Sequence, residues 1–237
     1  MTDTTGETDV PLLERSAPLV PTAHQDRTLK AAAVVGVGGF AIAALVTGLV
    51  TPGYDARREA ISGLAALDSP HAWIMIVGFV FSAVGLLSAG LLLWKHVPGR
   101  AARVGSGLVV VAAALMAVAG LARQDCSDQL VTCKDYGEAV DASGSYWVHQ
   151  QASLVGFVLL IIAFFLLARG LRGTGRTGLA VASRTIGVTC VTGTVLLVVT
   201  PPLVVDNYGV VQRLFIALLF GWPVAAALLS SRRRITP

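Results

Sequence analysis

The sequence is poor in charged residues. Asp, Glu, Lys and Arg make up 14% of its 237 residues, whereas hydrophobic residues make up 54%. This composition is too apolar for an ordinary soluble domain. Charge is also absent from the middle of six long apolar runs, at residues 31–50, 72–93, 104–122, 148–168, 179–200 and 211–230. Each run has about twenty residues, enough to cross a hydrocarbon core about 30 Å thick. The sequence therefore predicts an all-α, polytopic membrane protein with six transmembrane helices.

The chain also lacks the short motifs that mark common chemistries. It has no P-loop and no glycine-rich strand–helix turn, so nucleotide binding is not expected. It has no HExxH, HxxxH or paired CxxC spacing, so no metal site is predicted. No cofactor is predicted, and the sequence leaves open whether the protein is an enzyme.

Residues 1–30 lack the pattern of a cleavable signal peptide, which has a basic start, a short apolar run and a small-residue cleavage site. They carry Asp3, Glu7 and Asp9 near their start instead. The predicted organisation is a disordered cytoplasmic tail, a six-helix transmembrane domain and a basic cytoplasmic tail. These parts span residues 1–30, 31–230 and 231–237.

Basic residues are divided unevenly between the two sides of the predicted bundle. Six spans place both termini on one side, and basic residues next to spans favour the cytoplasm. The side of the termini carries Arg15, Arg27, Lys30, Lys95, Arg100, Arg103, Arg169, Arg172, Arg176, Arg184, Arg232, Arg233 and Arg234. The other side carries Arg57, Arg58, Arg123, Lys134 and Arg213. Both termini are therefore predicted to be cytoplasmic, and the net charge of +4 reflects topology and contact with anionic lipid rather than nucleic-acid binding.

The excess of arginine over lysine indicates the kind of genome that encodes the chain. The chain has fifteen Arg and three Lys and is rich in Ala, Val and Gly, which is typical of a GC-rich bacterial genome. The predicted location is the bacterial plasma membrane. The predicted partners are the lipid bilayer and a lipid or small-molecule ligand on the outer side, and protein partners are left open.

Small residues predict where the helices pack closely. Lipid offers little hydrophobic drive between helices, so contacts use small side chains. The predicted contact faces contain Gly36, Gly39, Ala43, Gly78, Ser82, Gly85, Gly105, Ala112 and Ala113.

The first outer loop begins with a turn at residues 52–55. Asp55 can cap a short helix, because its carboxylate accepts free backbone N–H groups. Ile61, Leu64 and Ala65 then share one face at helical spacing. This pattern predicts a helix on the outer membrane surface, with a rigid connector or a lid over a pocket as the alternatives.

Two cysteines lie in the second outer loop, which faces an oxidising exterior. Cys126 and Cys133 are predicted to form a disulfide, with a free pair or metal ligation left open. Cys190 lies inside the fifth span and is predicted to be a packing residue.

Polar residues gather at the predicted outer ends of the spans. Asp125 ends the third span, His149 begins the fourth, and Arg213 begins the sixth. Asp125 is predicted to orient the His149 tautomer while Arg213 binds an anionic head group. The structural alternative is an Asp125–Arg213 ion pair that ties helix ends together.

Several of these residues carry a resemblance to a known family. They are Pro52-Gly53-Tyr54-Asp55, Arg58, Ser62, Leu64, Asp125, His149, Gly209-Val210-Val211-Gln212-Arg213 and Trp222. In this order the sequence resembles the domain-of-unknown-function 998 family of six-helix bacterial membrane proteins. In that family the loop Asp is usually followed by Pro, whereas Cys126 follows Asp125 here. The resemblance implies fold and topology and supplies no reaction.

The function hypotheses centre on the outer polar cluster. The first is binding of a lipid or small molecule from the outer side, or support of a partner. The alternatives are a lipid-headgroup hydrolase with His149 and Asp125 as catalytic residues and, third, a small transporter. The predicted ligand-binding residues are Tyr54, Asp55, Arg58, Ser62, Asp125, His149, Gln212 and Arg213.

Overall fold

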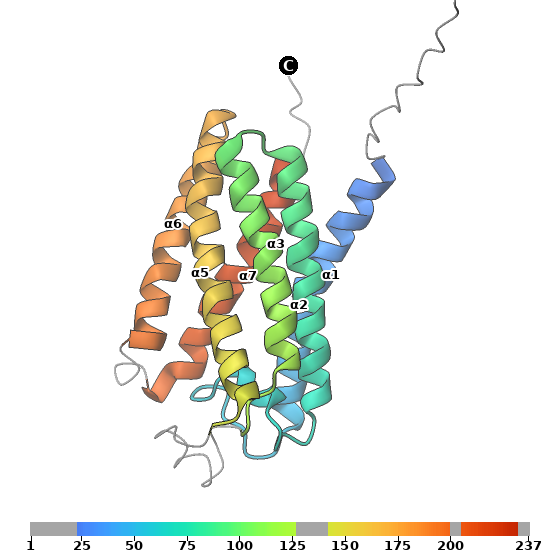
Figure 1. Cartoon of the computed structure of the whole chain (residues 1–237), viewed down its shortest axis with the longest axis vertical. Coiled ribbons are helices and arrows are strands. Elements are labelled where there is room, and N and C mark those ends of the chain that lie inside the picture. The colour runs from blue at the N-terminus through green and yellow to red at the C-terminus, as the bar shows by residue number, and fades with distance from the viewer. Residues whose placement is uncertain (1–22, 127–141, 200–204, 232–237) are drawn as a thin grey trace, which may run out of the picture.

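A computed structural model describes residues 23–126, 142–199 and 205–231. Within these residues all regular structure is helical (Figure 1). The elements are α1 (Ala23–Val50), η1 (Ile61–Ala65), α2 (Ala72–His96), α3 (Arg100–Leu121), α5 (Gly144–Gly173), α6 (Thr177–Thr194), η3 (Val195–Val199), η5 (Val205–Asn207) and α7 (Tyr208–Ser230). In the described part of the chain, six helices are long and apolar enough to cross a membrane, with α6 and η3 forming one span. The predicted all-α fold with six transmembrane helices is confirmed.

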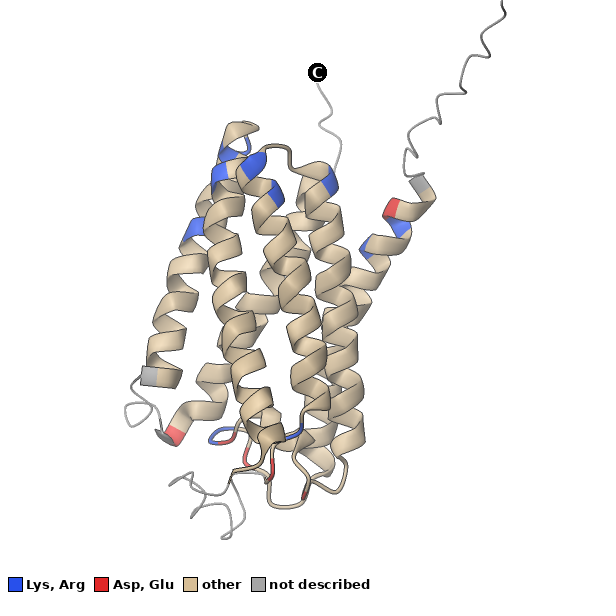
Figure 2. Ribbon diagram, in the orientation of Figure 1, with Lys and Arg blue, Asp and Glu red and all other residues tan. Residues whose placement is uncertain are grey.

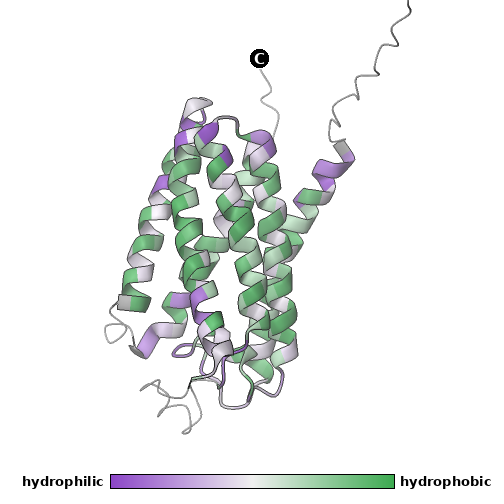
Figure 3. Ribbon diagram, in the orientation of Figure 1, coloured by the Kyte–Doolittle hydropathy of each residue, from purple (hydrophilic) through white to green (hydrophobic). Residues whose placement is uncertain are grey.

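The bundle has two chemically different ends with an apolar body between them. Figure 2 shows most Lys and Arg at one end and most Asp and Glu at the other. Figure 3 shows that the body between the ends is dominated by hydrophobic residues. We call the end with Lys95, Arg100 and Arg172 the basic end. The opposite end, with Asp55 and Asp125, is called the acidic end.

Helix α1 begins at Ala23, before the predicted start of the first span. Asp26 lies in its first turn, where a carboxylate interacts favourably with the helix dipole. Lys95 Nζ donates to Asp26 at 2.6 Å, and His96 Nε2 lies 3.1 Å from the same carboxylate. Residues 23–30 are therefore helical rather than part of the predicted tail, because Asp26 fixes this turn to the end of α2. The rest of that tail, residues 1–22, lies outside the described residues.

The predicted small-residue faces of α1 and α2 do form close helix contacts. A Cβ added to Gly36 of α1 would lie 2.5 Å from Gly85 Cα of α2. One added to Gly78 of α2 would lie 2.7 Å from Ala43 Cβ of α1. Small side chains thus let the backbones of α1 and α2 approach closely, as expected for helices in lipid.

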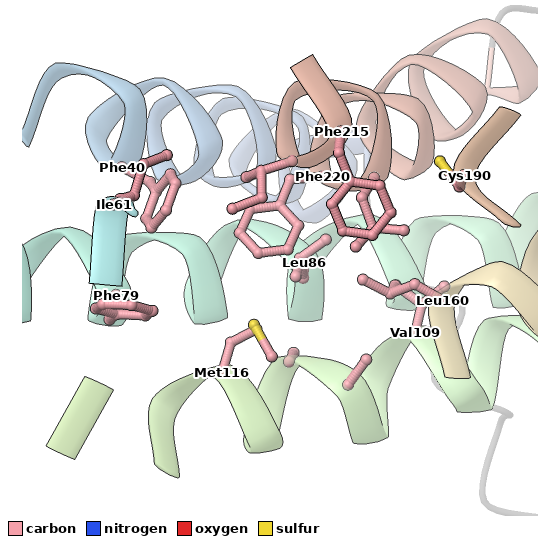
Figure 4. Close-up of a cluster of buried hydrophobic side chains, with 14 of the residues drawn as sticks. Phe40, Ile61, Phe79, Leu86, Val109, Met116, Leu160, Cys190, Phe215 and Phe220 are labelled. Atoms are coloured by element: carbon pink, nitrogen blue, oxygen red, sulfur yellow. The ribbon is translucent and has the colours of Figure 1, made fainter. Parts of the chain in front are cut away.

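The buried core contains a cluster of aromatic side chains. Figure 4 shows Phe40 of α1, Phe79 of α2 and Phe220 of α7 in one cluster of buried side chains. The ring centroid of Phe40 lies 5.6 Å from that of Phe79 and 5.3 Å from that of Phe220, and both pairs are edge to face. This is the favoured geometry for aromatic pairs. Cys190 of α6 is buried in the same cluster, in agreement with a packing role.

A polar contact joins α5, α6 and α7 within the apolar body. Ser183 Oγ donates to Phe164 O at 2.9 Å and accepts from Trp222 Nε1 at 3.0 Å. Ser183 is fully buried. The hydrogen bonds therefore satisfy polar atoms that would be costly to leave unpaired in an apolar environment.

Candidate functional site

The loop between α1 and α2 folds into the acidic end of the bundle. Ile61, Leu64 and Ala65 of η1 are 4%, 1% and 2% exposed. These apolar side chains join the core cluster with Phe40 and Met75. The predicted helix on the membrane surface is therefore wrong, because its apolar face packs against the bundle instead of lipid.

Arg213, near the start of α7, holds this loop in place. Its Nη1 donates to the carbonyl oxygens of Ala56 at 2.7 Å, Glu59 at 3.0 Å and Gly209 at 2.9 Å. Its Nη2 donates to the Tyr54 hydroxyl, and its Cζ lies 5.6 Å from the centre of the Tyr54 ring. The guanidinium is therefore committed to groups of the protein. The sequence had predicted that Arg213 binds an anionic head group, and the structure instead directs its guanidinium at the loop.

Exposed polar side chains make further contacts between this loop and the residues just before α7. Arg58 Nη2 lies 3.1 Å from Asp206 Oδ1, and Arg57 Nε donates to Asn207 Oδ1 at 2.8 Å. Asp55 Oδ1 accepts from the Arg57 backbone N–H at 2.9 Å, which caps the turn much as predicted. These residues fasten the loop.

A second arginine, whose role no sequence pattern indicated, holds the other end of the loop. Arg123 Nε donates to Ala65 O at 3.0 Å, and its Nη2 donates to Ala66 O at 2.6 Å. The backbone N–H of Leu67 donates to Gln124 O at 2.9 Å. The loop is thus tied to the end of α3 as well as to α7.

Asp125 pairs with Ser143 and not with His149. The Ser143 backbone N–H donates to Asp125 Oδ2 at 2.8 Å, and Ser143 Oγ donates to Asp125 Oδ1 at 2.5 Å. Ser143 is the N-cap of α5 and accepts from the Tyr146 N–H. Among the described residues no hydrogen bond or ion pair joins Asp125 to His149 or Arg213. The predicted orienting role of Asp125 and the alternative Asp125–Arg213 ion pair are both wrong, because Asp125 supports the cap of α5.

His149 is 2% exposed and is oriented by the backbone of α3. Its Nδ1 lies 2.7 Å from Ala119 O and 3.0 Å from Ala122 O. Carbonyl oxygens only accept hydrogen bonds, so Nδ1 carries the proton. Ala119 lies in the last turn of α3 and Ala122 is its C-cap, where carbonyls have no further helical N–H available to them. In the neutral ring Nε2 is then an acceptor, and it has no hydrogen-bond partner among the described residues.

A cavity of about 440 Å³ lies beside His149. This volume is within the range of about 300–1,000 Å³ that is typical of small-molecule sites. Its apolar walls include Phe40, Phe79, Met116, Phe157, Phe215 and Phe220. Its polar lining includes Ser62, Gln124, Asp125, Tyr146, His149, Gln150, Gln151, Ser153 and Gln212. The cavity therefore combines hydrogen-bonding groups with aromatic side chains.

The cavity gathers only half of the predicted ligand-binding residues. Ser62, Asp125, His149 and Gln212 line it. Tyr54 and Arg213 instead line an apolar crevice of about 390 Å³ between α1 and α7. Asp55 and Arg58 line neither of these spaces.

The sequence did not predict the aromatic walls or the roles of Ser143 and Tyr146. Ser143 had a recognisable signal, because serine just before an apolar run is typical of a helix N-cap. The aromatic residues had none, since phenylalanine is common throughout the apolar runs.

One of the two cysteines of the second outer loop lies at this site. Cys126 lines the cavity, whereas Cys133 lies outside the described residues, so their disulfide stays a prediction. The described part of the chain contains no group of three or more His, Cys, Asp or Glu residues with the arrangement of a metal site.

Comparison with known proteins identifies the family. A family model described as "protein of unknown function (DUF998)" matches residues 34–229. The chain belongs to the DUF998 family. This match confirms the resemblance seen in the sequence and, with the six apolar helices, identifies a multi-pass membrane protein. Neither the curated proteins nor the solved structures gave a match.

Proposed function

We propose that this DUF998 protein binds an amphipathic molecule, a lipid or a lipid-like small molecule, in the cavity beside His149. The observation that carries the proposal is the change of lining along the helices. The polar residues Gln124, Tyr146, His149 and Gln212 stand at helix ends, whereas Phe157 and the other aromatic walls lie further along the spans. Such a cavity matches a molecule with a polar head and an apolar chain.

The accessibility of the cavity lining supports entry from the side of the bundle. Val198 of η3 lines the cavity and is 54% exposed, and Gln151 of α5 lines it and is also exposed. Ala60 and Ile61 line the cavity from the loop that covers the acidic end. A lipid would therefore enter between α5 and η3, from the apolar phase around the helices.

Filling the cavity tests this function. Ser153 is half-buried and lines the cavity, so the indole of Ser153→Trp would occupy ligand space. Val155, on the same helix, is 44% exposed and does not line the cavity, so Val155→Trp is the matched control. Native mass spectrometry of protein released from nanodiscs should show one retained lipid for the parent and for Val155→Trp, and its loss for Ser153→Trp. Equal lipid retention in all three proteins would refute the proposal.

We further infer that both termini are cytoplasmic and that the acidic end faces outward, because most basic residues lie at the opposite end. Leu67 is exposed at the acidic end and Pro98 at the basic end. Cysteine would be introduced singly at each position in a chain without Cys126, Cys133 and Cys190. A membrane-impermeant maleimide should label Leu67→Cys in intact cells, and should label Pro98→Cys only after lysis. Labelling of Pro98→Cys in intact cells would show that the orientation is the opposite of the one inferred.

A lipid-headgroup hydrolase is the second candidate function. It is favoured by one observation: His149 lines the cavity, and its Nε2, which is unprotonated in the neutral ring, fits a general base. Asp125 lends it no support, because its carboxylate is bound to Ser143. Transport is favoured less, because Glu59, in a loop, is the one buried charged residue of the described part.

A further inference from the structure

We infer that the head group of the bound molecule is uncharged and carries hydroxyl groups, as in an acylglycerol, and that one hydroxyl donates a hydrogen bond to His149 Nε2. This inference rests on the proposed binding of an amphipathic molecule and adds the chemical class of its head group.

The charge of the cavity lining disfavours an anionic head group. Among the described residues that line the cavity there is no Lys or Arg, and the charged residue is Asp125. Four described arginines lie at this end and none of them lines the cavity. Arg123 and Arg213 donate to backbone carbonyls of the loop. Arg57 and Arg58 contact Asn207 and Asp206. A phosphate or carboxylate would lose water without gaining a cation, and it would lie close to another negative charge.

Asp125 would contribute little to the affinity for a cationic head group. Both carboxylate oxygens already accept hydrogen bonds from Ser143, and the side chain is only half-buried. Water therefore screens the attraction of Asp125 for an ammonium group, and such partly exposed ion pairs contribute little.

The hydrogen-bonding groups of the cavity match a hydroxyl. His149 Nε2 can only accept while the ring is neutral, since Nδ1 carries the proton. Gln212 Oε1 accepts from the Ile61 N–H at 2.7 Å, which leaves its amide NH₂ to donate. The Tyr146 hydroxyl accepts from Gln150 Nε2 at 3.2 Å and can still donate its own proton. A hydroxyl both donates and accepts, so it can satisfy His149 together with Gln212 or Tyr146.

The apolar part of the cavity fits the remainder of such a molecule. The Phe157 ring centroid lies 5.4 Å from that of Phe215 and 6.4 Å from that of Phe220, and all three residues line the cavity. An acyl chain against these rings would be removed from water, which favours binding without further polar contacts.

Two substitutions of His149 separate its ligand contact from its structural contact. In His149→Asn the side-chain amide N–H can take the place of Nδ1 and donate to Ala119 O and Ala122 O. It has no atom at the position of Nε2. The longer side chain of His149→Gln can place an oxygen acceptor near the position of Nε2. Asparagine should therefore preserve the cap on α3 and lose the ligand, whereas glutamine should keep the ligand contact.

The experiment measures three probes with the same chain length by native mass spectrometry of the full-length protein in detergent. Monopalmitoylglycerol is the uncharged hydroxyl probe, palmitoyl-lysophosphatidylglycerol the anionic one and hexadecylamine the cationic one. The parent should bind monopalmitoylglycerol roughly tenfold more tightly than either charged probe. This is the difference expected when one polar group is buried without a hydrogen-bond partner, as the charged head group would be. His149→Asn should weaken monopalmitoylglycerol binding roughly tenfold at an unchanged melting temperature, and His149→Gln should retain the parental preference.

The outcomes distinguish this inference from the proposed function. If all three probes bind equally well, or a charged probe binds best, and Ser153→Trp weakens their binding, the cavity binds lipid but the head-group inference is wrong. The head-group inference is also overturned if His149→Asn binds monopalmitoylglycerol as the parent does. If Ser153→Trp leaves the binding of every probe unchanged, the proposed function itself fails.

Discussion

Replacing Arg213 with methionine is expected to cause a large loss of thermal stability. The guanidinium donates to the carbonyl oxygens of Ala56 and Glu59 and to the Tyr54 hydroxyl. Methionine keeps most of the apolar stem but removes the donors to Ala56 O and the Tyr54 hydroxyl and one of the two donors to Glu59 O. Each acceptor left buried and unpaired costs about 1–3 kcal/mol. Arg213→Lys should also destabilise, because an ammonium cannot reproduce the fork of donors of a guanidinium.

Arg58→Met is the matched control for the Arg213 variants. Arg58 and its partner Asp206 have side chains that are 62% and 69% exposed, and such pairs contribute about 0–1 kcal/mol. Melting temperatures of the purified proteins in detergent should fall strongly for Arg213→Met and barely for Arg58→Met. Similar values for both variants would show that Arg213 does not hold the loop as described.

Replacing Gly36 with alanine is expected to separate α1 from α2. The added Cβ would lie 2.5 Å from Gly85 Cα, Gly85 N and Phe81 O, all of which are backbone atoms. These atoms cannot move aside as a flexible side chain would, so the helices must shift apart. Overpacking of this kind costs about 1–3 kcal/mol.

Gly38→Ala provides a control two residues away on the same helix. A Cβ at Gly38 meets nothing within 4 Å. Both substitutions gain the same helix propensity, about 1 kcal/mol for glycine to alanine, so their difference isolates the contact with α2. Thermal unfolding should occur at a lower temperature for Gly36→Ala than for Gly38→Ala. The close approach of α1 and α2 would be refuted if the two melting temperatures coincided.

The acidic end shows which contacts between single residues could be predicted from the sequence and which could not. Asp125 and His149 were expected to pair because they end and begin consecutive spans. Both do line one cavity, but each satisfies its hydrogen bonds elsewhere, Asp125 with Ser143 and His149 with the carbonyls of Ala119 and Ala122. Proximity along the chain predicted the neighbourhood and not the partner, because the rotation of each helix decides where its side chains point.

The sequence by itself determined the six spans, the family and the small-residue faces between α1 and α2. These features depend on local properties, namely the length of an apolar run and the volume of side chains such as Gly36 and Gly85. Only the tertiary structure decided that Arg213 binds the loop, that η1 enters the bundle and that His149 lines a cavity. Each of these depends on carbonyl oxygens or apolar walls from distant segments, and the sequence does not encode their direction in any local pattern.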